Sequence, residues 1–264
     1  MHPLHHRVAT LIEKVGTDVI LPRFGRLASE HIRLKAADEI VTVVDHESED
    51  RLAEGLARIL PEAGIVGEEG AAANPALLEQ AGEGLRWIID PIDGTANFVA
   101  GKPPFGVLVA LVDNGVTEAG WLFDPIDGRM CHAQRGRGAW IDAERVKAEE
   151  SGAPLPIAAI STMFMEAGRK ADFKARAKGK MRLVDIPRCA AEQYPRLVLG
   201  QNDLALFERA LPWDHAAGVL FVNEAGGRVA RADGSPYLVG DLRPGLLGAA
   251  SPRLWDEAAQ ILFG

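Results

Sequence analysis

Residues 87–98 constrain this chain more tightly than any other stretch. An apolar run ends in Asp90, a proline follows at once, and Asp93 comes three residues after Asp90. Because the residue before a proline is pushed out of the helical region, Asp90 is expected at the end of a strand. Gly94 then permits a tight turn, and Thr95 can open a helix whose first N–H groups are free. Carboxylates suit hard cations and free N–H groups suit phosphate, so the stretch predicts a metal-assisted phosphate site.

Three more acidic segments have simpler explanations when each is considered alone. Glu68 and Glu69 lie between two glycines after a short strand, where a solvated acidic loop is the common outcome. Asp45 and Asp214 each stand at the expected start of a helix, where an aspartate often caps the free N–H groups. Capping does not require the Trp before Asp214 or the Ala-Ala-Gly after His215, and these small residues indicate close helix packing near a site.

Taken in order, these segments resemble the inositol monophosphatase family of magnesium-dependent phosphatases. That family carries a D-P-[IL]-D-G-T core, an upstream Glu-Glu pair and a downstream W-D-x-A-A-G, which match residues 90–95, 68–69 and 213–218. Residues 40–45 match a further element, and the likeness spans about residues 35 to 250. Several motifs in register are far more specific than one. The resemblance implies an α/β (α+β) fold, a layered αβαβα sandwich of the inositol monophosphatase or fructose-1,6-bisphosphatase type.

The resemblance also implies a role for each acidic residue. Neighbouring carboxylates repel one another unless a cation lies between them, which favours metal binding on physical grounds as well. Asp45 and Thr95 would orient the water that attacks the phosphate, and Glu69 would orient a ligand or a water molecule. The residues implied to hold two or three Mg²⁺ ions are Glu68, Asp90, Ile92 through its carbonyl group, Asp93 and Asp214.

The substrate is expected to be a small phosphorylated metabolite. Inositol-using family members carry Gly-[Ser/Thr]-Ala after an arginine, whereas here Arg188 is followed by the bulkier Cys-Ala-Ala-Glu-Gln-Tyr. This departure argues against inositol phosphate and leaves histidinol phosphate, fructose 1,6-bisphosphate and adenosine 3′,5′-bisphosphate open. The candidate substrate-binding residues are Gly94, Thr95, Arg188, Glu192, Glu208 and Lys35.

The apolar periodicity divides the chain at about residue 150. Residues 1–150 are expected to form an N-terminal α+β half with most of the metal ligands. Residues 151–264 are expected to form a C-terminal α/β half that adds Asp214 and the specificity residues to one phosphatase unit, 1–264. An antiparallel meander is expected over 106–141. Helices are expected over 4–29, with a kink or end at Pro22, and over 46–60, 189–199, 214–225 and 253–262. Strands are expected over 64–66, 86–90, 157–161, 181–185, 203–207 and 246–250.

One pentapeptide, Asp-Pro-Ile-Asp-Gly, occurs twice, at residues 90–94 and 124–128. The second copy is followed by Arg129 rather than by a threonine, and it precedes another expected strand. Proline, aspartate and glycine are common turn formers, so we interpret this copy as a hairpin turn.

Composition limits the partners. The net charge is −8 with both signs interspersed, which argues against nucleic acid or an anionic membrane surface as a partner. The N-terminal residues lack the apolar core of a signal peptide, and no apolar run could span a bilayer. The two cysteines, Cys131 and Cys189, predict no disulfide framework, so a cytoplasmic enzyme is expected. The resemblance implies a homodimer.

A non-enzymatic function is the competing class. A protein that binds metal and senses a phosphorylated ligand needs the same metal-binding acids, but it does not need a pair that activates water. Both Asp45 and Thr95 are present, which favours the enzyme. No serine or cysteine stands in a pattern typical of a nucleophile with its base.

Overall fold

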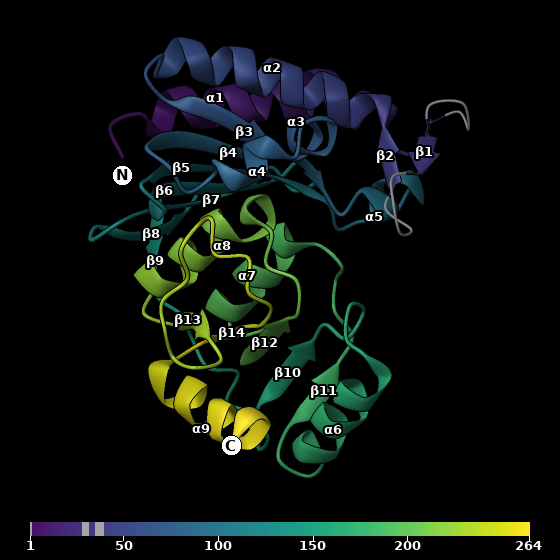
Figure 1. Cartoon of the computed structure of the whole chain (residues 1–264), viewed down its shortest axis with the longest axis vertical. Helices are drawn as coiled ribbons and strands as arrows, with labels where there is room; N and C mark the ends of the chain where they lie inside the picture. The colour runs from purple at the N-terminus through teal and green to yellow at the C-terminus, as the bar shows by residue number, and fades with distance from the viewer. Residues whose placement is uncertain (1, 28–31, 35–39) are drawn as a thin grey trace.

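The computed structural model describes residues 2–27, 32–34 and 40–264, which fold into alternating layers of helix and sheet (Figure 1). The larger sheet has seven strands in sequence order, β3 to β9. Only its first pair, β3 and β4, is parallel, and every later pair is antiparallel, as expected for a meander. The strands are β3 Gly64–Gly67, β4 Leu85–Asp93, β5 Gly106–Asp113, β6 Val116–Asp124, β7 Arg129–Gln134, β8 Gly138–Ile141 and β9 Glu144–Val146.

The smaller sheet comes from the second half of the chain, in the order β11-β10-β12-β14-β13. β10 is parallel to both of its neighbours, and β14 is antiparallel to both of its own. The strands are β10 Ile157–Ile160, β11 Arg182–Val184, β12 Leu204–Phe207, β13 Arg228–Arg231 and β14 Leu246–Ala249. A separate short pair, β1 Ile32–Leu34 and β2 Ile40–Thr42, leads into the second helix.

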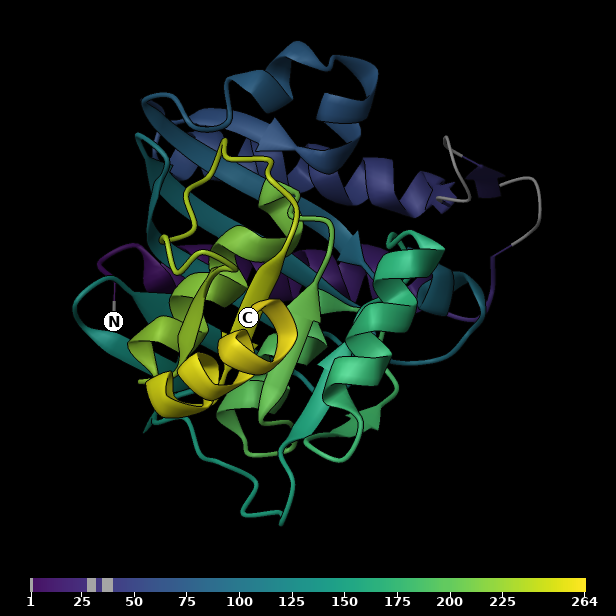
Figure 2. The ribbon, with the colours of Figure 1, turned by 60° about the horizontal axis from the view of Figure 1, so that its bottom comes forward.

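Helices cover both outer faces and fill the space between the sheets, which confirms the expected αβαβα sandwich. α1 and α2 lie on the larger sheet, α7 and α8 lie between the sheets, and α6 and α9 cover the smaller sheet (Figure 2). The main helices are α1 His5–Val15, α2 Val43–Ile59, α6 Ala167–Ala177, α7 Ala190–Val198, α8 Pro212–Glu224 and α9 Pro252–Phe263. Short helices α3 Glu68–Ala73, α4 Ala76–Glu79 and α5 Thr95–Val99 lie in the connections.

Each interlayer space has its own apolar core. Trp87 and Trp121 of the larger sheet pack against α1 and α2, with their ring centroids 5.9 Å apart. Tyr194 of α7 and Phe221 of α8 are fully buried between the two sheets. Trp255 of α9 is buried on the outer face of the smaller sheet. None of the helices in the described part of the chain combines the length and apolar character needed to cross a bilayer.

Several expected boundaries were wrong for identifiable reasons. The first helix gives way to a π turn (Gly16–Ile20) and then a 3-10 turn (Leu21–Arg23) that contains the expected breaker Pro22. α2 begins three residues before the expected start, because Thr42 caps it. α8 begins at Pro212, since a proline is pre-shaped for the first helical turn. Asp45 and Asp214 are therefore third residues of their helices and not the cap residues themselves. α6 and β13 were not anticipated, and neither were the short elements β1, β2, β9, α3 and α4.

Candidate active site

A cavity of about 510 Å³ opens where residues from both sheets meet. Its lining includes the end of β4, the start of α5, and residues from β10 and β12. Residues in the first turns of α7 and α8 also line it. The cavity is therefore lined by the ends of strands and helices from both halves of the chain. Motifs that are far apart in the sequence lie together there.

Three carboxylates converge at this cavity. Asp90, Asp93 and Asp214 each offer an oxygen, and these oxygens all lie within 4.8 Å of one another. Among the described residues, no other group of three His, Cys, Asp or Glu side chains comes together in this way. Asp90 is only 1% exposed and Asp93 is 9% exposed, so the cluster has little water to screen its charge.

Burial and mutual repulsion destabilise the charged form of these acids. Burial, followed by the charges of Glu68, Asp93 and Asp214, raises the pKa of Asp90 well above its ordinary value. Burial also raises the pKa of Asp93 to about 6, although N–H donors around its carboxylate act in the opposite direction. Charged carboxylates held this close require a compensating positive charge, and that requirement is the physical argument for a cation.

Backbone N–H groups fix the orientation of two of these acids. The N–H of Ile92 donates to Asp90 Oδ1 at 3.1 Å, which shapes the bend around the proline. The N–H of Ala191, in the first turn of α7, donates to Asp93 Oδ2 at 2.6 Å. Asp93 thus connects the end of β4 to a helix 98 residues further along the chain.

Asp45 is both a capping residue and a partner of Thr95. Its Oδ2 accepts from the N–H and the hydroxyl of Thr42, at 2.8 and 2.6 Å, in a reciprocal capping box. Its Oδ1 lies 3.2 Å from the hydroxyl of Thr95, which is also 2.8 Å from the carbonyl oxygen of Ile92. Burial raises the pKa of Asp45 to about 6, even though the Thr42 hydrogen bonds favour its charged form.

The glutamate pair opens the short helix α3. Glu68 lines the cavity, whereas Glu69 is 5% exposed and contributes to the raised pKa of Asp45. The carboxylate of Glu49, on α2, accepts from the N–H groups of Glu69 and Gly70 at 2.8 and 2.7 Å. Sequence reasoning missed Glu49 as the residue that positions α3. The available signal was its place one helical turn after Asp45 on the same face.

Some of the expected substrate-binding residues line the cavity, and others do not. Arg188 lines the cavity with a left-handed backbone, φ 57°, and Glu208 lines it while pairing with Arg169 at 2.9 Å. Glu192 does not line it and instead pairs with Arg129 and Arg196, at 2.5 and 2.7 Å. Gly94 and Thr95 both line the cavity. Lys35 lies outside the described residues.

The donor set fits a hard divalent cation. The converging ligand atoms are all carboxylate oxygens, which Mg²⁺ prefers to nitrogen or sulfur. The nearest candidate nitrogen ligand, His215, is already engaged at both ring nitrogens, by the Tyr194 hydroxyl at 2.7 Å and the Arg209 carbonyl at 2.8 Å. Burial of Cys189 raises its pKa well above the ordinary value, so a thiolate ligand is disfavoured.

Comparison with known proteins identifies the family of this chain and several of its relatives. The family model described as the inositol monophosphatase family matches residues 6–262. A fructose-1,6-bisphosphatase/inositol-1-monophosphatase of Thermotoga maritima is 31% identical over 225 residues, which cover 85% of this chain and 83% of the relative. A histidinol-phosphatase of Chlorobaculum parvum is 31% identical over 227 residues, covering 82% and 81%. A protein named Nus factor SuhB, of Xylella fastidiosa, is 30% identical over 260 residues, covering 94% and 85%.

Solved structures agree in fold. The IMPase of Thermotoga maritima superposes with a TM-score of 0.82 at 27% identity, covering 99% of this chain and 97% of that one. The extragenic suppressor protein SuhB of Bartonella henselae superposes with a TM-score of 0.84 at 23% identity, covering 99% of both chains. At that identity the second likeness concerns the fold alone.

Proposed function

The chain belongs to the inositol monophosphatase family and is a phosphomonoesterase, and from that premise we propose that it hydrolyses a small phosphorylated metabolite with Mg²⁺. The observation that carries the proposal is the meeting of two sets of groups at one cavity. Asp90, Asp93 and Asp214 converge there, and the Thr95–Asp45 hydrogen bond reaches the same hollow. A protein that only binds a phosphorylated ligand would need the first set and not the second.

The proposed cation site draws on both halves of the chain. Asp90, Asp93 and Asp214, with Glu68 and the carbonyl oxygen of Ile92, would hold two or three Mg²⁺ ions. When bound, Mg²⁺ offsets the negative charge of the phosphate and lowers the pKa of water, so that hydrolysis proceeds near neutral pH. Glu69, buried behind Glu68, would orient a water molecule or a ligand.

The protein's own groups would position the phosphate and move one proton. The backbone N–H groups at Gly94 and Thr95, where α5 begins, would hold the phosphate oxygens. Thr95 Oγ1 donates to Asp45 Oδ1, so its lone pairs can accept the proton of the attacking water while its own proton passes to Asp45. The leaving oxygen would take up a proton as its bond to phosphorus breaks, so the products would be an alcohol and inorganic phosphate.

The alcohol side of the cavity is set by residues away from the carboxylate cluster. Glu208 is 8% exposed, and no described residue hydrogen-bonds its Oε2. That oxygen is available to a hydroxyl or amine of the substrate. Arg188 lines the cavity, and among the described residues its guanidinium has only a weak contact, Nη2 to the sulfur of Met163 at 3.8 Å. It would meet a second anionic group. We no longer propose Glu192 as a substrate-binding residue, because its carboxylate pairs with Arg129 and Arg196.

Phosphate release by the purified protein tests the proposal. The panel is inositol 1-phosphate, histidinol phosphate, fructose 1,6-bisphosphate, adenosine 3′,5′-bisphosphate, glycerol phosphate and p-nitrophenyl phosphate, each with Mg²⁺ and with EDTA. We expect metal-dependent release that Asp93→Asn abolishes and that Asp127→Asn, an exposed aspartate in the second pentapeptide, leaves intact. Release that persists in EDTA or in Asp93→Asn would contradict the ligand assignment. Mg²⁺ binding by calorimetry without any release would favour the ligand-sensing function.

We further propose a homodimer in the cytoplasm, as the family resemblance implies. Light scattering on the purified protein should give twice the mass of the 28.4 kDa chain. A monomer at micromolar concentration would contradict the dimer while leaving the chemistry of the cavity untouched.

A further inference from the structure

A second hollow, of about 250 Å³, adjoins the active-site cavity. The two share Phe164, Glu208 and Arg209, whereas none of the three clustered carboxylates lines the second hollow. Its other lining residues are Ala210, Leu211, Leu242 and Pro244, all of them apolar. The second hollow is therefore a largely apolar continuation of the cavity, joined to it at Phe164, Glu208 and Arg209.

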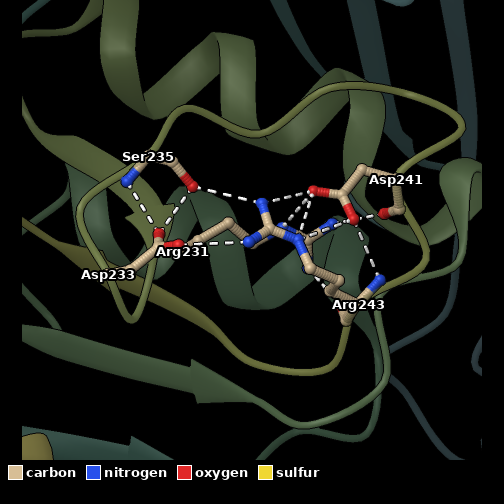
Figure 3. Close-up of polar contacts among 5 residues, drawn as sticks. All are labelled: Arg231, Asp233, Ser235, Asp241 and Arg243. Atoms are coloured by element: carbon tan, nitrogen blue, oxygen red, sulfur yellow. Dashed lines mark hydrogen bonds and ion pairs between the residues drawn. The ribbon is translucent and has the colours of Figure 1, made fainter.

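A buried arginine fixes the wall of this hollow. The guanidinium of Arg231, which is 2% exposed, donates to the main-chain carbonyls of Asp241 and Arg243, the residues on either side of Leu242 (Figure 3). The N–H of Gly245 donates to the carbonyl oxygen of Glu208 at 2.9 Å. The network is closed by hydrogen bonds from the Arg243 side chain to Asp233, Ser235 and Asp241. Leu242 is thus held in place before any ligand arrives.

Several large apolar side chains that line one or both of the cavities are also exposed. Met163 is 53% exposed, Phe164 is 44% exposed and Leu242 is 47% exposed. The Arg209 guanidinium lies over one face of the Phe164 ring, 4.3 Å from its centroid, and so supports the ring from that side. Burying these side chains against an apolar ligand would be favourable, because it removes apolar surface from water.

The second hollow itself offers few groups to a polyol. Of its lining residues only Glu208 and Arg209 have polar side chains. Glu208 already pairs with Arg169 at 2.9 Å, and the Arg209 guanidinium lies over the Phe164 ring. A sugar-like alcohol with many hydroxyls would leave several of them facing apolar side chains without hydrogen bonds, and each such burial is costly.

We propose that the second hollow receives an apolar end group of the substrate, so that the natural phosphomonoester has an alcohol part ending in an alkyl chain or a ring. The proposal rests on the proposed function, because the carboxylate cluster places the phosphate. The phosphate lies at the N–H groups of Gly94 and Thr95, beside the Mg²⁺ ions that the carboxylates would hold. The alcohol passes Glu208, and its apolar end packs against Phe164 and Leu242.

Binding of n-alkylphosphonates, from ethyl to octyl, tests the proposal by calorimetry with Mg²⁺ present. These compounds lack the ester bond, so their dissociation constants report on the hollow whether or not the protein turns over a phosphate ester. We expect the affinity to rise about two- to fourfold per methylene over the middle of the series and then to level off when the hollow is full. The matched alkyl phosphates should show the same trend in kcat/KM.

Two exposed leucines of one loop make a matched pair of variants. Leu242→Glu places a charge in the hollow and should remove most of the gain per methylene, while ethylphosphonate binds within twofold of wild type. Leu238 is 43% exposed and lines neither cavity, so Leu238→Glu should keep the wild-type series. A flat series in wild type, or equal behaviour of the two variants, overturns the proposal. No turnover of any ester, with the chain-length trend intact, contradicts the proposed function alone.

Discussion

The two copies of Asp-Pro-Ile-Asp-Gly form similar local bends, but only the first copy lies in the candidate active site. In each copy the first aspartate accepts from the N–H two residues on, at 3.1 Å for Asp90 and 2.9 Å for Asp124. Each glycine has a positive φ, 83° at Gly94 and 69° at Gly128. The pentapeptide therefore specifies a turn, and whether that turn becomes a site depends on its surroundings.

The surroundings differ in burial and in neighbours. Asp93 is 9% exposed and lies against two other carboxylates, whereas Asp127 is exposed in the hairpin between β6 and β7. The residue after the glycine is Thr95 in one copy, at the start of α5, and Arg129 in the other, at the start of β7. The comparison teaches that burial and convergence of acids create the site. Paired substitutions at matching positions can break or sharpen this conclusion.

The largest contrast is expected at the first aspartate. Asp90→Asn should lower metal-dependent kcat by about a thousandfold, since losing a metal ligand removes on the order of 4 kcal/mol of transition-state stabilisation. Asp124→Asn should stay within twofold of wild type, because Asp124 only accepts turn hydrogen bonds and lies 3.6 Å from Arg129. Steady-state phosphate release measures both. Comparable losses in the two variants would mean that the second turn also supports catalysis.

The residue after the glycine should give the next largest effect. Thr95→Ala removes the hydroxyl that donates to Asp45 and should lower kcat by about a hundredfold, the usual contribution of a positioned proton-transfer group. Thr95→Ser keeps the hydroxyl and should recover most of that loss. Arg129→Ala should leave kcat within twofold, because Arg129 pairs with Asp124 and Glu192 away from the cavity. An active Thr95→Ala enzyme would remove this hydroxyl from the mechanism.

A smaller contrast is expected in the pH dependence of stability without metal. Burial raises the pKa of Asp93 from its ordinary value of 3.8 to about 6. Between those two pH values the folded state holds a proton that the unfolded state has released, so this carboxyl's contribution to stability falls as pH rises. Metal-free Asp93→Asn should therefore gain stability over wild type across that window, by roughly 3 kcal/mol in total.

Urea unfolding in EDTA at a series of pH values measures this difference, with Asp127→Asn as the matched baseline. Comparing variants cancels the histidines, whose low pKa values give wild type an opposite slope at acid pH. A difference curve for Asp93→Asn that stays flat, or that falls as pH rises, would contradict the raised pKa.

The smallest contrast is expected at the glycines. Both have positive φ, so alanine should cost about 1 kcal/mol at either position from backbone strain alone. A Cβ at Gly128 would meet nothing within 4 Å, whereas one at Gly94 would lie 3.1 Å from the Pro104 carbonyl oxygen and 3.2 Å from Cys189 Cβ. Gly94→Ala should therefore lower the melting temperature further than Gly128→Ala. Equal shifts would mean that the packed copy relaxes around the extra methyl group.

The sequence was most informative where the signal was local. The local signals predicted the acids at residues 68–69 and 90–93, the meander, and the capping role of Asp45. Each of these depends on residues within a few positions of one another. Glu192 was misplaced because its partners, Arg129 and Arg196, belong to another strand and to the next turn of α7. Apolar periodicity shows which face of a helix is buried, but it does not show which charged residues will pair across elements.

Two of the missed elements, α6 and β13, lack an apolar pattern. In α6 only Phe173 and Ala177 are buried, so its helical periodicity is too sparse to detect. β13 contains two arginines in four residues, and Arg231 is nonetheless buried. Its charge is compensated by Asp241 and by carbonyl groups ten and twelve residues on, an arrangement that only the folded chain reveals.

The hydrogen bond from the Ala191 N–H to Asp93 has a consequence for when the site can form during synthesis on the ribosome. A nascent chain interrupted before residue 190 contains Asp90 and Asp93, but it has neither the α7 N–H group nor Asp214 to complete their setting. Translation must pass residue 214 before the three carboxylates can come together. We therefore expect fragments that end before residue 190 to lack metal-dependent phosphatase activity.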